Sequence, residues 1–398
     1  MKREVIFATL VVLIATVEFF ASNELLRGYL REPEYLAKEL KSAPDALYEY
    51  RLSEEAPFKY RLLFPTLIQK TQQILFDPSD NEGFYLSYKY WSLIFYAGSA
   101  LAFFYLMLTC GFSPARSFLG TSVYLIMPAM TMAYTLPIHT REDTLGYTIF
   151  FVGLAFIIQK KRWPLLIVAV LGALTRETLL LLPLLYLLFG SDDSLGKKLL
   201  IFTVPVMIWL LVRFLSDQQP YDIWLGLKWN LDNPAQVVGF TFIAFNFLWL
   251  FFLLHYLIYK RNLHYITMDL RFFYRSSITV LLIILGTTFI GGIFNEIRLL
   301  QLFAPWMVIF FLDILRGNRV QFRNVAGTKN YLAYGVACGA LCAALLWLAL
   351  HNRESLITPG KYAVPYDQWI VFSVFYVFIL LLFIPPLVKI FFSKDVTR

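Results

Sequence analysis

The chain has 398 residues, of which 59% are hydrophobic and 16% charged, and its net charge is +8. A soluble domain is about half apolar and about a quarter charged, so this composition excludes an ordinary soluble protein. The basic residues cluster in short loops, which is typical of the cytoplasmic side of a membrane protein and does not indicate nucleic-acid binding. We predict an all-α, polytopic transmembrane helical bundle.

About twelve apolar segments are candidates for transmembrane helices, and two of them are very short. The first segment follows Lys2 and Arg3, but it lacks a convincing small-residue cleavage site and Glu18 interrupts it. We therefore interpret it as a retained helix and not as a signal peptide. The predicted helices cover residues 4–22, 90–110, 117–136, 143–159, 164–175, 177–189, 198–215, 236–258, 276–294, 298–314, 331–350 and 369–392.

The positions of lysine and arginine predict the orientation of these helices. If the N-terminus is cytoplasmic, the inner loops carry sixteen basic residues, whereas the outer loops and helix ends carry seven. The bias is consistent along the chain. It predicts a multi-pass protein of the cell membrane, of the bacterial inner-membrane type, with both termini in the cytoplasm.

Residues 164–189 form either one long helix or two short ones. A single helix would place the basic loops at 260–275 and 316–329 outside, so the charge bias favours two segments that meet at residues 175–177. Each half is about 20 Å long at ~1.5 Å per residue, shorter than a ~30 Å membrane core. We therefore expect the turn to lie below the outer surface and to line a cavity within the protein.

The segment 21–89 is expected on the outer side, with two amphipathic helices. Residues 34–50 and 60–76 both have an apolar and a polar side, and such helices lie in the plane of the membrane interface. In the second helix, the pattern places Ile74 on the apolar face and Gln72 on the polar face.

Three polar clusters interrupt the apolar sequence, at residues 139–143, 175–177 and 295–298. Ionisable groups in such places are costly, so they usually face a cavity or pair with one another, and they mark function. In the predicted topology all three clusters face the outer side. The candidate substrate-binding residues are Arg61, His139, Arg141, Arg176, Glu296 and Arg298, and the candidate catalytic residues are Asp45, Glu142 and Glu177.

Structural roles compete with function in the first cluster. Thr140 and Asp143 have the spacing of a capping box, which satisfies backbone N–H groups at a helix start, and we interpret capping as their main role. Arg141 and Glu142 have as their alternative an ion pair that only fixes the helix end.

The other candidates have structural alternatives as well. Arg176 and Glu177 can form a buried pair that holds the two short helices together. Arg298 can reach a phosphate or can pair with Glu177 or Glu296. Asp45 can act in catalysis or be a solvated surface acid.

The order of several motifs resembles the membrane-embedded GT-C glycosyltransferase superfamily. The likeness covers most of residues 1–314 and comprises the large first outer segment, the stretch 58–65 (FKYRLLFP), the outer Arg-Glu-Asp, the stretch 175–180 (TRETLL) and the stretch 295–300 (NEIRLL) before Ala304-Pro305. The resemblance implies inverting transfer of a sugar from a polyprenyl-phosphate-linked donor on the non-cytoplasmic face. It also implies an acidic base in the first outer segment, for which Asp45 is the best match, and basic residues that hold the donor phosphate.

We therefore predict a membrane glycosyltransferase, with residues 1–314 as the GT-C-like catalytic module and 315–398 as C-terminal transmembrane helices. Its expected partners are a lipid-linked sugar donor, membrane lipids and an acceptor that the sequence does not identify. No spacing of acidic residues requires a metal, and a divalent cation stays an open alternative. The alternatives to a transferase are a transporter or lipid flippase, and an outer-face polysaccharide polymerase.

Overall fold

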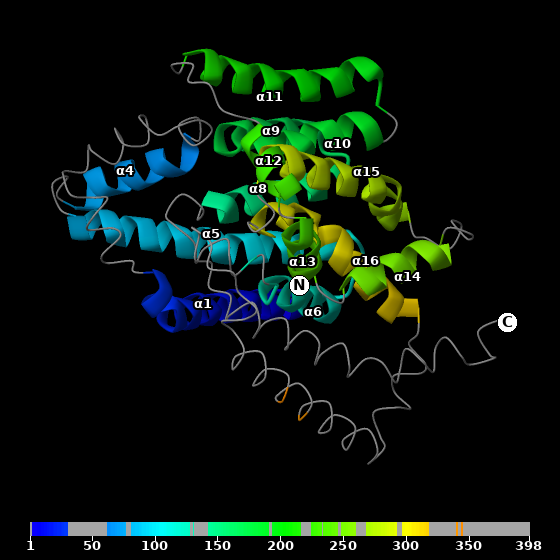
Figure 1. Cartoon of the computed structure of the whole chain (residues 1–398), viewed down its shortest axis with the longest axis horizontal. Helices are drawn as coiled ribbons and strands as arrows, with labels where there is room; N and C mark the ends of the chain where they lie inside the picture. Colours follow the sequence, from blue (N-terminus) through cyan, green and yellow to red (C-terminus); the bar gives the residue numbers. More distant parts are fainter. Residues whose placement is uncertain are drawn as a thin grey trace.

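All regular structure in the described part of the chain is helical. The structure is a computed structural model, and the helices lie side by side in a layered bundle (Figure 1). The prediction of an all-α protein is confirmed. The described residues are 2–30, 62–76, 81–127, 130, 142–190, 193–215, 224–232, 234–245, 248–259, 268–292, 297–317, 340 and 344.

Most predicted helices are present, with shifted ends. The helices are α1 (Lys2–Leu30), α4 (Leu63–Leu75), α5 (Asn81–Thr109), α6 (Pro114–Leu125), α8 (Glu142–Ile158), α9 (Arg162–Thr175), α10 (Leu181–Phe189), α11 (Leu195–Leu215), α12 (Trp224–Asp232), α13 (Pro234–Phe245), α14 (Leu248–Tyr259), α15 (Met268–Gly291) and α16 (Ala304–Gly317). Two 3-10 helices, η3 (Glu177–Leu180) and η5 (Ile297–Phe303), lead directly into α10 and α16. The predicted C-terminal helices at 331–350 and 369–392 lie almost wholly outside the described residues.

Four helices of the described part are long and apolar enough to cross a membrane, which supports a membrane protein. They comprise Leu86–Thr109, Leu195–Leu215, Leu270–Gly291 and Arg298–Leu315. The last of these is the central helix, because its residues from Trp306 to Leu312 are all buried. By contrast, α11 exposes many large apolar side chains on the outside of the bundle, as expected for a helix in contact with lipid.

The chain between residues 162 and 189 is a hairpin of two short segments. Helix α9 ends at Thr175, and Arg176 has an extended backbone (φ −156°, ψ 143°) before η3 begins. At the base of the hairpin, the Arg162 guanidinium forms an ion pair with Asp193, and its Nε donates a 2.8 Å hydrogen bond to the same carboxylate. One continuous helix would separate these residues by about 45 Å at ~1.5 Å per residue. The prediction of two short segments is therefore confirmed.

The predicted single helix at 236–258 is wrong, because the structure contains two helices, α13 and α14. The indole Nε1 of Trp249 donates a 2.9 Å hydrogen bond to the carbonyl of Thr241, eight residues earlier. In a straight helix these residues would be about 12 Å apart along the axis, so the chain must bend between them. The bend lets the Trp249 ring pack against Phe245, Phe252 and Phe303. Helix α12, just before α13, was also not predicted.

The second predicted amphipathic helix is present as α4, but its buried face is not the predicted one. Helix α4 runs antiparallel along the side of α5: Phe64 packs on Phe95, and the Trp91 indole donates to the Thr71 hydroxyl at 2.7 Å (Figure 1). The buried stripe is Phe64, Ile68 and Gln72, four residues apart, whereas Ile74 is 77% exposed. The apolar and polar faces thus differ from the predicted ones, because packing on α5 decides the rotation of α4. The other predicted amphipathic helix, 34–50, lies outside the described residues.

A side chain from α12 fixes the C-terminal end of α15. The Asn230 amide Nδ2 donates to the carbonyls of Phe289 and Gly292, each at 2.9 Å, and lies 3.4 Å from the Thr288 carbonyl. Thr288 and Phe289 belong to the last turn of α15 and Gly292 follows it; the last carbonyls of a helix have no partner within the helix, although here the Thr288 carbonyl also accepts from the Gly292 amide. Gly226 lies against the same turn, where an added Cβ would come within 2.5 Å of the Gly292 carbonyl oxygen.

We expect Asp193→Asn to lower the thermal unfolding midpoint at neutral pH. A hydrogen bond from the Tyr186 hydroxyl, and secondly the neighbouring Arg162, lower the pKa of Asp193. A lowered pKa stabilises the fold above the unfolded-state value of about 3.9, and this contribution disappears as the pH falls through the lower folded value. The test is the midpoint in detergent between pH 7 and 3. Equal pH profiles for wild type and Asp193→Asn would contradict the prediction, and Asp232→Asn, at an exposed position, is the control.

We expect Asn230→Ala to cost about 1–3 kcal/mol of stability, since it removes the donor from buried carbonyls. Asn230→Asp should cost more, because a carboxylate would face three carbonyl oxygens. Denaturant titration in detergent measures both, with the exposed neighbour Lys228→Ala as the control. Aspartate tolerated as well as alanine would contradict the capping role.

Candidate functional site

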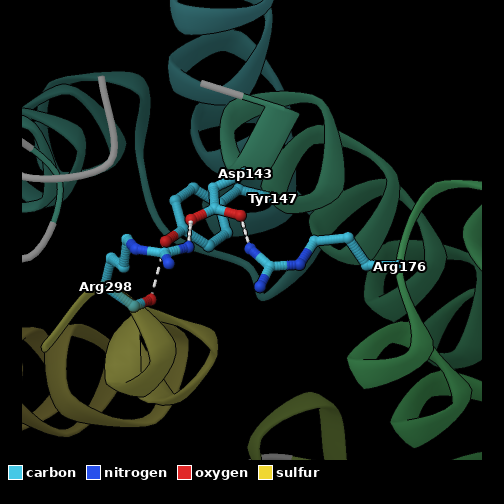
Figure 2. A network of polar contacts seen from close by, with 4 residues as sticks. All are labelled: Asp143, Tyr147, Arg176 and Arg298. Atoms are coloured by element: carbon cyan, nitrogen blue, oxygen red, sulfur yellow. Dashed lines mark hydrogen bonds and ion pairs between the residues drawn. The ribbon is translucent and has the colours of Figure 1, made fainter. Parts of the chain in front are cut away.

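Residues from all three polar clusters of the sequence have neighbouring positions in the fold. Asp143 lies in the first turn of α8, Arg176 at the tip of the α9–α10 hairpin, and Arg298 in η5 (Figure 2). Their side chains meet at the Asp143 carboxylate, which lies between the two guanidinium groups. The structure therefore brings one residue from each cluster together, and their placement on the outer side stays a prediction.

One carboxylate accepts both arginines. Nη1 of Arg298 donates to Oδ2 of Asp143 at 2.5 Å, and Nη1 of Arg176 forms an ion pair with Oδ1. Asp143 is fully buried, and Arg176 and Arg298 are 6% and 3% exposed. Breaking a buried pair by removing one partner leaves an uncompensated charge and is strongly destabilising. The three side chains taken alone carry a net charge of +1.

Local structure places each of the three groups. Helix α8 is apolar on nearly all sides, so the first turn of this buried helix carries Asp143 into the interior. The hairpin segments are too short to cross a membrane core, so Arg176 at their tip lies within the bundle. Arg298 comes from a 3-10 turn that precedes the central helix α16.

Tyr147 also holds Arg298, through the backbone of that residue. Its hydroxyl donates a 2.7 Å hydrogen bond to the backbone carbonyl of Arg298 (Figure 2). Tyr147 lies four residues after Asp143, on the same face of α8. One face of α8 therefore binds both the side chain and the backbone of Arg298, which fixes η5 against α8.

A small cavity adjoins this cluster. Its volume is about 10 Å³, close to the least space that holds one water molecule. The space beside the three charged side chains is therefore about the size of one water molecule. The cavity is lined by Asp143, Gly146, Tyr147, Arg176, Thr178, Leu179, Arg298, Leu299 and Leu302.

The main role predicted for Asp143 needs correction. We predicted a capping box with Thr140, which lies outside the described residues, but the Asp143 carboxylate contacts two arginines from distant segments. Arg298 likewise pairs with Asp143, which was not among its predicted partners, and the predicted partner Glu296 lies outside the described residues. Sequence reasoning missed Asp143 and Tyr147 as site residues. Asp143 and Tyr147 are four residues apart in an otherwise apolar helix, and this spacing, which places both on one face, could have identified them as site residues.

The remaining candidates are less well placed, or lie outside the described part. Glu142 is buried next to Asp143 in the chain and Glu177 is partly buried beside Arg176, but neither lines the cavity. The candidates outside the described residues are Asp45, Arg61, His139, Arg141 and Glu296. Among the described residues there is no group of three or more His, Cys, Asp or Glu side chains that could hold a metal ion.

The segment that was predicted to lie on the outer side contacts the site through its backbone. The amide of Leu62, the residue before α4, donates a 3.1 Å hydrogen bond to the carbonyl of Leu174. Leu174 lies in the last turn of α9, two residues before Arg176. The start of α4 therefore meets the hairpin just beside its tip.

A second buried polar pair lies at the opposite end of α16. His255 Nε2 is 3.1 Å from Oδ2 of Asp313, and the His255 ring stacks on Phe310 with centroids 4.0 Å apart. Fifteen residues separate Arg298 from Asp313, so at ~1.5–2 Å per residue this pair is roughly 25 Å from the arginine cluster. It joins α14 to α16 and does not contribute to the same site.

Comparison of the chain with protein-family models, with curated proteins and with solved structures gave no match. The resemblance to GT-C glycosyltransferases therefore stays a prediction from the sequence motifs.

We expect Asp143→Asn to destabilise the protein by about 3–5 kcal/mol, because it removes the negative charge that contacts two buried cations. The double variant Asp143→Asn/Arg298→Gln should lose less than the sum of the single variants, since the two residues interact directly. Unfolding in detergent measures all three. Strictly additive losses would contradict the coupling.

Proposed function

We propose that this chain is a membrane glycosyltransferase that moves a sugar from a polyprenyl-phosphate-linked donor to an acceptor on the non-cytoplasmic face. The observation that carries the proposal is the meeting of Arg176 and Arg298 at one buried carboxylate. Two arginines held within an apolar bundle are costly, and such groups usually mark a substrate site. Basic residues are more frequent in the loops on the predicted cytoplasmic side, which supports placing the two arginines near the opposite, non-cytoplasmic side.

The arginines suit the phosphate of such a donor. A guanidinium is a planar fork of donors that matches phosphate oxygens. In the transfer, the acceptor oxygen bonds to the anomeric carbon while the bond from that carbon to the phosphate oxygen breaks. The electron pair stays on the departing lipid phosphate, and two cations in a site with little water stabilise that charge.

The acceptor proton needs a separate base. Asp143 is a poor candidate, because both of its oxygens lie against arginine cations; its role is to position Arg176 and Arg298. Glu142, Glu177 and Asp45 stay the candidates for the base.

The small cavity has a consequence for donor binding. A phosphate is larger than the single water molecule that the cavity holds. A phosphate bound beside the arginines needs more room than this, which movement of the three side chains would supply, with phosphate oxygens taking over contacts of the Asp143 carboxylate.

One feature favours the second candidate function, a transporter or lipid flippase. The chain contains two interrupted helices, α9–η3–α10 and α13–α14, and interrupted helices form the binding sites of many transporters. A flippase would bind the same lipid phosphate but would leave the bond between sugar and phosphate intact.

We expect purified protein to release polyprenyl phosphate from a matching sugar donor, and Arg176→Lys and Arg298→Lys to slow this release. Lysine keeps the charge but loses the planar fork. By analogy with removing one electrostatic donor from an active site, the loss should be about 10²–10³-fold. The assay is chromatography of the lipid product from a panel of synthetic donors, with and without acceptor alcohols.

Arg271→Lys, at an exposed position near the start of α15, is the matched control and should retain activity. Failure of every donor in the panel to react or to bind would refute the transferase. Intact donor that crosses proteoliposome membranes would instead support the flippase.

A further inference from the structure

A basic surface lies at the base of the α9–α10 hairpin. We call it the basal cluster and define it as Lys160, Lys161, Arg162, Lys197 and Lys198. It comes from two loops that are more than thirty residues apart in the sequence. The proposed transfer reaction uses none of these residues, and they lie at the far end of the hairpin from Arg176.

The fold holds the two loops together. The ion pair and hydrogen bond between Arg162 and Asp193 connect the start of α9 to the loop before α11. Lys197 is close enough to Asp193 that its positive charge helps to lower the pKa of that carboxyl. Helices α9 and α11 also pack against each other. The two basic loops therefore form one surface.

The turn between α8 and α9 has a defined backbone. The Lys161 amide donates to the Phe156 carbonyl at 2.9 Å and the Lys160 amide to the Ile157 carbonyl at 3.1 Å, with Lys160 at φ 58°. This pair of bonds with a left-handed residue is the Schellman motif that ends helices. It fixes the backbone that presents the two lysines.

Charge at this surface is unbalanced. In sequence, the five cations of the basal cluster stand against two carboxylates, Asp192 and Asp193, which leaves a net charge of +3. Helices α9 and α11 also both begin here, and helix N-termini favour anions. An anionic partner complements the surface.

Apolar side chains surround these charges. Trp163 is 71% exposed and Leu195 is 66% exposed, and Leu199 and Leu200 are exposed on the first turns of α11. A tryptophan beside lysines at the end of apolar helices is typical of the interface between lipid tails and head groups. A soluble anion would use the charges alone, whereas a phospholipid would use the charges and the apolar surface together.

We propose that the basal cluster binds the head group of an anionic phospholipid, with the acyl chains along the exposed side of α9 and α11. Lys161 and Lys197 contact the lipid phosphate, and Trp163 lies at the level of the head groups. Because the lipid bridges the loops before α9 and α11, its binding stabilises the base of the hairpin. This proposal is independent of the proposed transferase activity.

The test is titration of the detergent-solubilised full chain with dioctanoyl phosphatidylglycerol, followed by the thermal unfolding midpoint. We expect this lipid to stabilise the protein and dioctanoyl phosphatidylcholine to have little effect. Lys161→Gln/Lys197→Gln should weaken the apparent affinity about 25-fold, since each lysine near an anionic surface contributes on the order of 1 kcal/mol. Added salt should weaken the binding of wild type as well.

Two variants serve as controls. Lys161→Arg/Lys197→Arg should bind nearly as well as wild type, and Lys70→Gln/Lys228→Gln removes two exposed lysines elsewhere and should also bind normally. Equal loss in the Lys70/Lys228 variant, or equal stabilisation by phosphatidylcholine, would overturn the proposal. Full stabilisation by inorganic phosphate at the same concentration would also overturn it, because it would indicate an anion site without lipid recognition.

Discussion

The buried contact of one carboxylate with two arginines constrains the rest of this structure. An arginine within an apolar bundle needs a countercharge, and Asp143 supplies it to both Arg176 and Arg298. Three segments that are distant in sequence must therefore end at the same depth: the start of α8, the hairpin tip and η5. Tyr147 adds a hydrogen bond to the backbone of η5, so α8 is the element that organises the site.

The hairpin explains how an arginine reaches that depth. Each of its segments is too short to cross a membrane core, so the chain turns back inside the bundle, and the extended backbone at Arg176 makes the turn. The Arg162–Asp193 contact closes the hairpin at the other end. The tip thus carries the charge required by the proposed chemistry, and the base carries the basal cluster that faces the lipid head groups.

Several features of the fold were predictable because they depend on local composition or on charge counts. The apolar segments predicted the helices, and the distribution of lysine and arginine predicted the break at residues 175–177. Other features depend on contacts between distant segments. The rotation of α4 follows from Phe64, Ile68 and Gln72 packing on α5, and the bend between α13 and α14 accompanies the Trp249 contacts. The sequence of either segment does not reveal which distant side chains it will contact.

The sequence by itself determined that this chain is an apolar, helical protein with three polar clusters, because the cost of charge in an apolar environment makes such clusters conspicuous. It also identified Arg176 and Arg298 as candidates. Only the tertiary structure decided that Asp143 is their common partner. A capping carboxylate and a carboxylate that binds two arginines have the same local sequence, and the difference lies in which distant side chains the packing of α8, the hairpin and η5 brings to it.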